Sequence, residues 1–276
     1  MADKAREASA LRTLAYCYSY MGTTEYLQGR FRDSLENLER SAELYRQVDA
    51  PSGEAMALQR LGVVRTALGQ WERALADLHR ALDIARGYIL ESHSMMRVYA
   101  TLARNRLEAS DYSAALAYAE EGLAIESQQG RCLICGVLLY PAAAMAYGMT
   151  GGIESGRRYA QVARESAARY GSKFFFGLAC QATAMVEASA ACWKEAFAAL
   201  EQAQSAFRAI PQPYEVARTH LFRAYIQMRR HKPHDIAAAA KELSLAVPTF
   251  VRLGATASAA QAKSMLLQVR AQIKSK

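Results

Sequence analysis

Bulky apolar and small residues recur along this chain at intervals of 40 to 43 residues. In each interval a bulky residue is followed three places later by a small one on the same helix face. The bulky positions are Phe31, Trp71, Tyr112, Ile153, Trp193 and Ile236, and their small partners are Ser34, Ala74, Ala115, Gly156, Ala196 and Ala239. A second series keeps the same step: Gly22, Gly62, Ala103, Ala144, Ala184 and Ala224. A fixed period of this length predicts stacked structural units rather than one globular core.

Each unit is predicted to contain two amphipathic helices, because apolar residues are spaced three and four apart within it. In the second unit such a pattern runs from Met56 to Leu68, stops at Gly69, and begins again at Trp71. No useful length of chain alternates with period two, so strands are not expected. Small residues such as Gly62 and Ala74 would allow the two helix axes to approach closely.

The predicted fold is an all-α, right-handed solenoid of about six helix pairs plus a C-terminal capping helix, forming one domain over residues 1–276. The capping helix is expected because the last unit would otherwise expose its apolar edge. The expected units cover residues 8–47, 52–87, 92–127, 131–169, 172–208 and 212–251, and the capping helix covers 255–273.

The second unit resembles the tetratricopeptide repeat (TPR) at Leu61-Gly62, Gly69, Trp71, Ala74, Leu78 and Ala81. The repeat in this chain is about six residues longer than the 34-residue standard, which predicts longer helices. The resemblance implies that the first helix of each pair lines an inner, concave surface. The chaperone-tail clamp of this repeat family is not supported, because its Lys and Asn positions hold other residues in this chain.

Segments at residues 47–55, 213–218 and 250–255 are similar to the C-terminal repeat regions of large bacterial regulators, which belong to the maltose-regulator or large LuxR class and the antibiotic regulatory proteins. In those proteins the repeats act as a sensor or a partner platform beside an ATP-binding switch. This chain shows no such switch, so a fragment of a longer regulator and a stand-alone relative both fit.

The net charge of +8 is concentrated at one end of the chain. Residues 218–276 carry a net charge of +9, whereas residues 1–217 carry −1. Arg229, Arg230 and Lys232 form the densest part of this basic end. It suggests contact with an acidic protein or with a nucleic-acid backbone, and a merely solvated face is the alternative.

Cysteine usage and hydropathy favour a cytoplasmic protein without membrane contact. The five cysteines are odd in number and irregularly spaced, which argues against a disulfide framework. Cys132 and Cys135 have metal-ligand spacing, but no second pair of ligands lies near them in the sequence and His93 is distant. We therefore expect buried structural thiols, with redox sensing as the alternative, and neither a metal nor a cofactor.

Catalytic signatures are absent, since the chain has no phosphate-binding loop, GxGxxG, HExxH or GxSxG motif. We expect a protein that is not an enzyme. Its partner is expected to be a protein or peptide, or a small-molecule inducer.

The concave surface is the expected binding site, with an apolar, methionine-rich middle flanked by arginines. The predicted binding residues are Tyr16, Tyr26, Gln59, Arg97, Arg104, Met145, Met149, Gln181, Met185, Arg218 and Tyr225. Such a groove suits an apolar body with an anionic group, because arginine binds carboxylate or phosphate through two hydrogen bonds. Core packing of the methionines, and pairing of the arginines with Glu108 or Glu120, are the alternatives.

The leading functional prediction is a non-catalytic sensor that relays ligand or partner binding to a transcriptional or signalling output. A pure protein–protein scaffold, and nucleic-acid contact through the basic end, are the two alternatives.

Overall fold

The computed structural model describes residues 2–87 and 91–274, and within these ranges the regular structure is entirely α-helical. The thirteen helices are α1 (Ala2–Leu27), α2 (Phe31–Gln47), α3 (Pro51–Ala67), α4 (Trp71–Ala85), α5 (Glu91–Glu108), α6 (Tyr112–Gln129), α7 (Leu133–Met149), α8 (Ile153–Tyr170), α9 (Lys173–Ser189), α10 (Trp193–Arg208), α11 (Pro213–Arg230), α12 (Asp235–Leu253) and α13 (Thr256–Lys274). The predicted fold class, a solenoid of six helix pairs and a capping helix, is confirmed.

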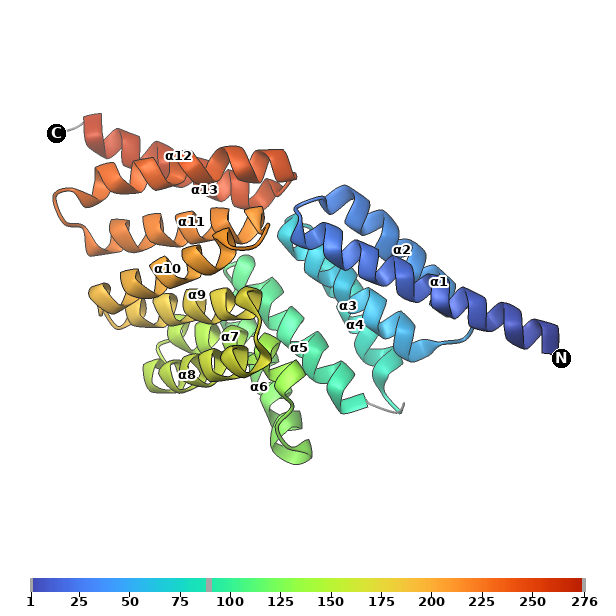
Figure 1. Ribbon diagram of the computed structural model, residues 1–276. Helices are drawn as coiled ribbons and strands as arrows, with labels where there is room; N and C mark the ends of the chain where they lie inside the picture. Colours follow the sequence, from blue (N-terminus) through green and yellow to red (C-terminus); the bar gives the residue numbers. More distant parts are fainter. Residues whose placement is uncertain (1, 88–90, 275–276) are drawn as a thin grey trace.

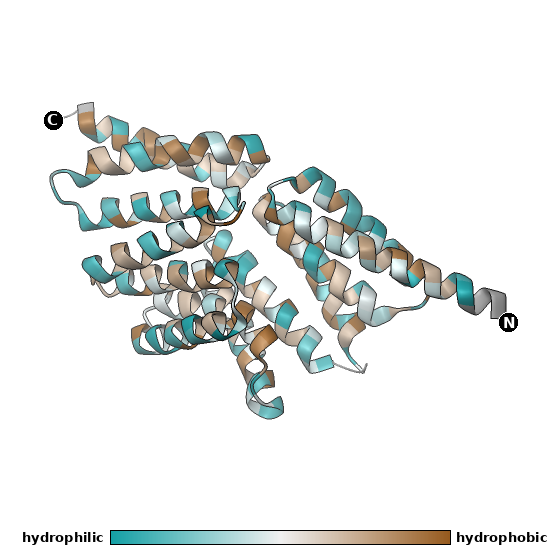
Figure 2. Cartoon of the chain, in the orientation of Figure 1, coloured by the Kyte–Doolittle hydropathy of each residue, from teal (hydrophilic) through white to brown (hydrophobic). Residues whose placement is uncertain are grey.

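The helices pack as six pairs, α1 with α2 through α11 with α12, and α13 covers α12. The first helices of successive pairs also contact one another, as α3 does α5, α5 does α7, and α7 does α9. Hydrophobic and hydrophilic residues mix along most helices (Figure 2). The second helices α2, α4, α8, α10 and α12 are clearly amphipathic, whereas α7 is buried along most of its length. No helix in the described ranges combines the length and apolarity needed to cross a lipid bilayer.

The recurring small residues let the two helices of a pair approach closely. All members of both small-residue series are buried. At Gly62 an added Cβ atom would lie 2.6 Å from Leu78 Cδ2, and at Gly22 it would lie 2.6 Å from Leu38 Cγ. The repeated motif of the sequence is therefore a helix-packing motif, in which a small residue on one helix receives a large residue from the other.

The curvature of the array brings its two ends into contact (Figure 1). Gln212 Nε2, just before α11, donates a hydrogen bond of 2.7 Å to the Leu27 carbonyl oxygen at the end of α1. Thr256 Oγ1 on α13 donates one of 3.1 Å to the Leu68 carbonyl oxygen. The ring of Phe31 packs edge-on against Tyr214 with 5.6 Å between centroids. These contacts close the concave side of the solenoid into an interior.

Gly69 lies at this closure and gives the first prediction. Its φ is +79°, and an added Cβ atom would lie 2.4 Å from Ala257 Cβ on α13. Gly69→Ala is expected to lower the unfolding free energy by about 2–4 kcal/mol, from left-handed backbone strain plus overpacking. Urea denaturation would measure the change.

Gly151→Ala is the matched control, because Gly151 has φ +92° but no neighbour within 4 Å of an added Cβ atom. It carries the backbone strain alone, about 1–2 kcal/mol. Equal losses in the two variants would show that the contact with α13 contributes nothing to stability.

Candidate ligand-binding cavity

The closed interior contains a cavity of about 300 Å³. The first helices of all six pairs contribute to its wall, through residues that include Tyr26 (α1), Arg60 (α3), Arg97 (α5), Met145 (α7), Leu178 (α9) and Arg218 (α11). Its apolar side is formed mainly by Leu138, Pro141, Ala142, Met145, Phe174, Phe175 and Leu178. A largely apolar cavity with a few polar groups is typical of a small-molecule or peptide-end site.

One end of the cavity rests on a buried network of two arginines and two glutamates. Arg104 forms ion pairs with Glu215 and, over 3.1 Å, with Glu108. Arg218 Nη1 lies 3.1 Å from Glu215 and 3.6 Å from Glu108. Tyr214 Oη donates a hydrogen bond of 2.7 Å to Glu108. Since the positive and negative charges are equal in number, the network is neutral as a whole.

The network keeps Glu215 ionised although its side chain is fully buried. Burial by itself would raise the pKa of this carboxyl, but the charges of Arg104 and Arg218 outweigh burial and hold the pKa below its usual value. Burial likewise opposes the charge of Arg104, whose pKa is nevertheless raised by Glu215 and Glu108. The charge of Arg104 is therefore already balanced by ion pairs within the protein and is not free for a ligand.

Arg60 and Arg97 supply the net positive charge of the cavity. Both line it and both are partly buried. Neither has an ion-pair partner among the described residues. Arg60 Nη1 donates a hydrogen bond of 2.5 Å to Ser19 Oγ, and its guanidinium lies 4.8 Å from the Tyr20 ring centroid. Burial and the like charge of Arg97 lower the pKa of Arg60, so an anion at this wall would relieve an unfavourable interaction.

The hydroxyl of Tyr26 is a buried polar group that faces the same space. Tyr26 is 6% exposed and lines the cavity, and its hydroxyl has no hydrogen-bond partner among the described residues. Burial raises the pKa of this hydroxyl, so Tyr26 is neutral and can donate a hydrogen bond. Buried polar groups are usually paired, so an unpaired one beside a cavity indicates a place for a polar ligand atom.

The structure brings seven of the predicted binding residues to this cavity: Tyr26, Gln59, Arg97, Arg104, Met145, Gln181 and Arg218. Arg104 and Arg218 belong to the ion-pair network, and two more of the seven also have internal partners. Gln59 Nε2 donates to Thr101 Oγ1 over 2.7 Å, and Gln181 Nε2 donates to Thr219 Oγ1 over 2.9 Å. Both amides tie neighbouring first helices together, so they shape the wall.

The other predicted residues lie elsewhere. Met149, Met185 and Tyr225 line a smaller cavity of about 80 Å³, which shares Met145, Leu107 and Arg218 with the larger one. The sequence analysis placed all of them on one surface. In the structure the ion-pair network borders both cavities, since Arg104 lines the larger one, Glu108 the smaller one and Arg218 both. Tyr16 lines neither cavity: it is 50% exposed, and its ring contacts the Tyr20 ring in a tilted arrangement with 4.4 Å between centroids.

Contacts with Asp235 neutralise part of the positive charge of the basic end. Arg230 forms two hydrogen bonds with Asp235, of 2.9 and 2.6 Å, and the Lys232 backbone N–H donates to the same carboxylate. These contacts hold the turn between α11 and α12. Arg229 lies 5.8 Å from the Tyr225 ring centroid, so its guanidinium contacts an aromatic ring rather than a carboxylate.

Sequence reasoning missed Arg60, Phe174 and Phe175 as cavity residues. Arg60 follows the expected inner position Gln59, and it turns toward Ser19 and Tyr20 of the preceding unit. The sequence offered one indication of a free charge at Arg60: neither Ser19 nor Tyr20, which Arg60 faces, is acidic. Phe174 and Phe175 enter the cavity at the start of α9, where three consecutive aromatic residues occur.

Comparison with protein families identifies the repeat. Residues 6–86 and 53–127 each match the sequence pattern of the tetratricopeptide repeat. Residues 6–127 therefore contain tetratricopeptide repeats. These repeats cover the N-terminal units, and the later units continue the same helix-pair architecture. A comparison with curated protein sequences found no match.

Solved structures with similar folds support the TPR architecture over the whole length. A Rap protein in complex with competence and sporulation factor has a TM-score of 0.60 at 16% identity, over 95% of this chain and 76% of that chain. Aspartyl phosphate phosphatase F from Bacillus subtilis has a TM-score of 0.55 at 10% identity, over 97% and 73%.

A signal transduction ATPase with a tetratricopeptide repeat sensor, from Pyrococcus horikoshii, has a TM-score of 0.52 at 18% identity. The match covers 92% of this chain but 42% of that protein. At these identities the likeness concerns the TPR fold alone.

Proposed function

We propose that this chain is a non-catalytic sensor module whose interior cavity binds a small molecule or a peptide end with an apolar body and an anionic group. The observation that carries the proposal is the cavity itself, with its apolar wall and two arginines that form no ion pair with any residue the structure describes. The anionic group would lie between Arg60 and Arg97, and a polar atom would accept a hydrogen bond from Tyr26. The similar fold of a Rap protein that was crystallised with a bound factor supports a binding role.

A non-catalytic role is supported by the state of the nearest carboxylates. Glu108 and Glu215 are both engaged by Arg104 and Arg218. A carboxylate held as an ionised partner of two arginines is a poor general acid or base near neutral pH. Binding, rather than proton transfer, is therefore what this arrangement does best.

The output would arise from the closure between the two ends of the array. Leu27 lines the cavity, and its carbonyl oxygen accepts the closing hydrogen bond from Gln212. A ligand in the cavity would thus bias contacts that join the first and last units, and a signalling or transcriptional partner would read the change. Small-angle scattering with and without ligand would detect it, and identical profiles would contradict this route.

The first test is native mass spectrometry of gently purified protein. A mass excess that disappears on denaturation would support the proposal. The second test is titration with 8-anilinonaphthalene-1-sulfonate, a probe with an apolar body and an anionic sulfonate, which is expected to bind saturably at one site per chain.

A clean polypeptide mass together with no saturable probe binding would contradict the proposal and favour a protein scaffold. A complex with DNA or RNA whose affinity falls steeply with salt would instead favour contact through the basic end.

A further inference from the structure

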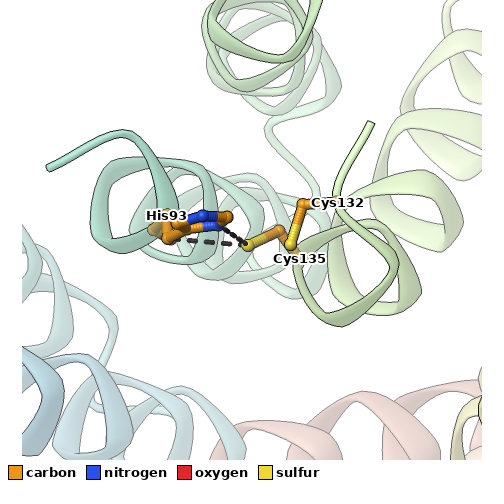
Figure 3. Close-up of side chains that lie close together, drawn as sticks. All are labelled: His93, Cys132 and Cys135. Atoms are coloured by element: carbon orange, nitrogen blue, oxygen red, sulfur yellow. Dashed lines mark hydrogen bonds between the residues drawn. The ribbon is translucent and has the colours of Figure 1, made fainter. Parts of the chain in front are cut away.

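Three metal-ligating side chains that are distant in sequence meet at the edge of the array. Helices α5 and α7 pack side by side. His93 lies in the first turn of α5, Cys132 is the N-cap residue of α7, and Cys135 lies in the first turn of α7. Figure 3 shows the imidazole directed toward the two thiols across the space between the helices. His93 is distant from the cysteines in sequence, 42 positions before Cys135, and stacking of the units brings these helix starts together.

The distances suit a tetrahedral metal ion. Cys135 Sγ lies 3.5 Å from His93 Nδ1. The nitrogen and the two sulfur atoms all lie within 4.8 Å of one another. Zinc bonds of about 2.3 Å to sulfur and 2.0 Å to nitrogen require ligand atoms roughly 3.5–3.8 Å apart in a tetrahedron. Small side-chain rotations would bring all three atoms to that spacing.

We propose that His93, Cys132 and Cys135 bind one zinc ion, with a solvent molecule in the fourth position. Two thiolates and an imidazole form a set that zinc prefers, and the thiolate charges balance the ion. Each cysteine releases its proton to the solvent as its sulfur–zinc bond forms. His93 is exposed, and the site opens into a surface depression lined by Glu91 and Gln129, which provides an entry path.

Bound zinc would join the N-terminal ends of α5 and α7. His93 and Arg97 lie one helical turn apart on α5, so the ion would also restrain the helix that carries a cavity arginine. The zinc site stands independently of the proposed ligand, because it uses different side chains and can be tested without any ligand.

The test is metal titration of the full chain, kept reduced with a phosphine reductant. One Zn²⁺ per chain is expected in competition with a chromogenic chelator. Co²⁺ in its place is expected to give the absorption bands of a tetrahedral thiolate complex. Cys132→Ser, Cys135→Ser and His93→Ala should each weaken Zn²⁺ binding by at least about 100-fold. A zinc-induced rise in melting temperature should also disappear in all three.

Cys192→Ser is the matched control, because Cys192 is a partly buried cysteine at the N-cap of α10, as Cys132 is at the N-cap of α7. It should bind zinc as the unaltered chain does. Failure of the folded, reduced chain to bind Zn²⁺ would overturn the proposal. Equal affinity in the Cys132→Ser and Cys192→Ser variants, or Co²⁺ spectra without thiolate bands, would do the same.

Discussion

Replacement of Glu215 by glutamine should lower the unfolding free energy by about 3–5 kcal/mol, because it leaves two buried guanidinium groups to share Glu108. Glu215 accepts from both Arg104 and Arg218, and its side chain is fully buried. The glutamine side chain has nearly the same shape, so the loss reports charge rather than packing. Urea denaturation monitored by circular dichroism would measure it.

The exposed pair Arg86–Asp83 is the control for the buried network. The two side chains lie 3.2 Å apart and are 60% and 72% exposed. Asp83→Asn should change stability by less than about 1 kcal/mol, as is usual for surface ion pairs. If Glu215→Gln cost no more than Asp83→Asn, the network would have no special role in holding α5 against α11.

The same network predicts an acid dependence of stability. The folded-state pKa of Glu215 is depressed below the ordinary value of 4.5, so its contribution is fully present above that value. The contribution is lost as pH falls through the depressed pKa. Stability of the unaltered chain should therefore fall more steeply with acid than that of Glu215→Gln. Parallel pH profiles below 4.5 would contradict the ionised state of Glu215.

The second large effect is expected at the cavity arginines. The double variant Arg60→Gln with Arg97→Gln should weaken binding of 8-anilinonaphthalene-1-sulfonate by at least about 10-fold, since each hydrogen bond to a charged group contributes about 1.5–3 kcal/mol. Its unfolding free energy should change little, because loss of the Arg60 hydrogen bond to Ser19 is offset by relief of the repulsion between two like charges that have no ion-pair partner among the described residues. Fluorescence titration and urea denaturation would measure the two quantities.

Arg106→Gln is the matched control for these arginines. Arg106 lies on α5 like Arg97, but it pairs with the exposed Glu72 over 3.2 Å and does not line the cavity. It removes one positive charge, half of what the double variant removes, and should leave probe affinity unaltered. Unchanged affinity in the Arg60 and Arg97 double variant would remove the anion site. Equal weakening by Arg106→Gln would show that the loss of probe affinity is a long-range effect of net charge.

Much of the architecture followed from local patterns. The spacing of small and bulky residues predicted helix pairs, because a helix can bury its apolar face only if that face recurs every three or four residues. The six pairs and the capping helix are present. Tyr26, Arg97 and Met145, which the same register assigns to the inner face of their helices, line the cavity.

The sequence by itself thus determined the repeating unit, its helix pairs and the inner face of each first helix, since all three depend on contacts within about one period. Only the tertiary structure decided which of the inner residues remain available to bind a ligand. Arg104 meets Glu215 across 111 positions, and His93 meets Cys135 across 42. The first pairing depends on how far the array curves before its ends touch, and curvature is the sum of small rotations between units that no local pattern encodes. The second depends on how two neighbouring units stack, which places the starts of α5 and α7 side by side.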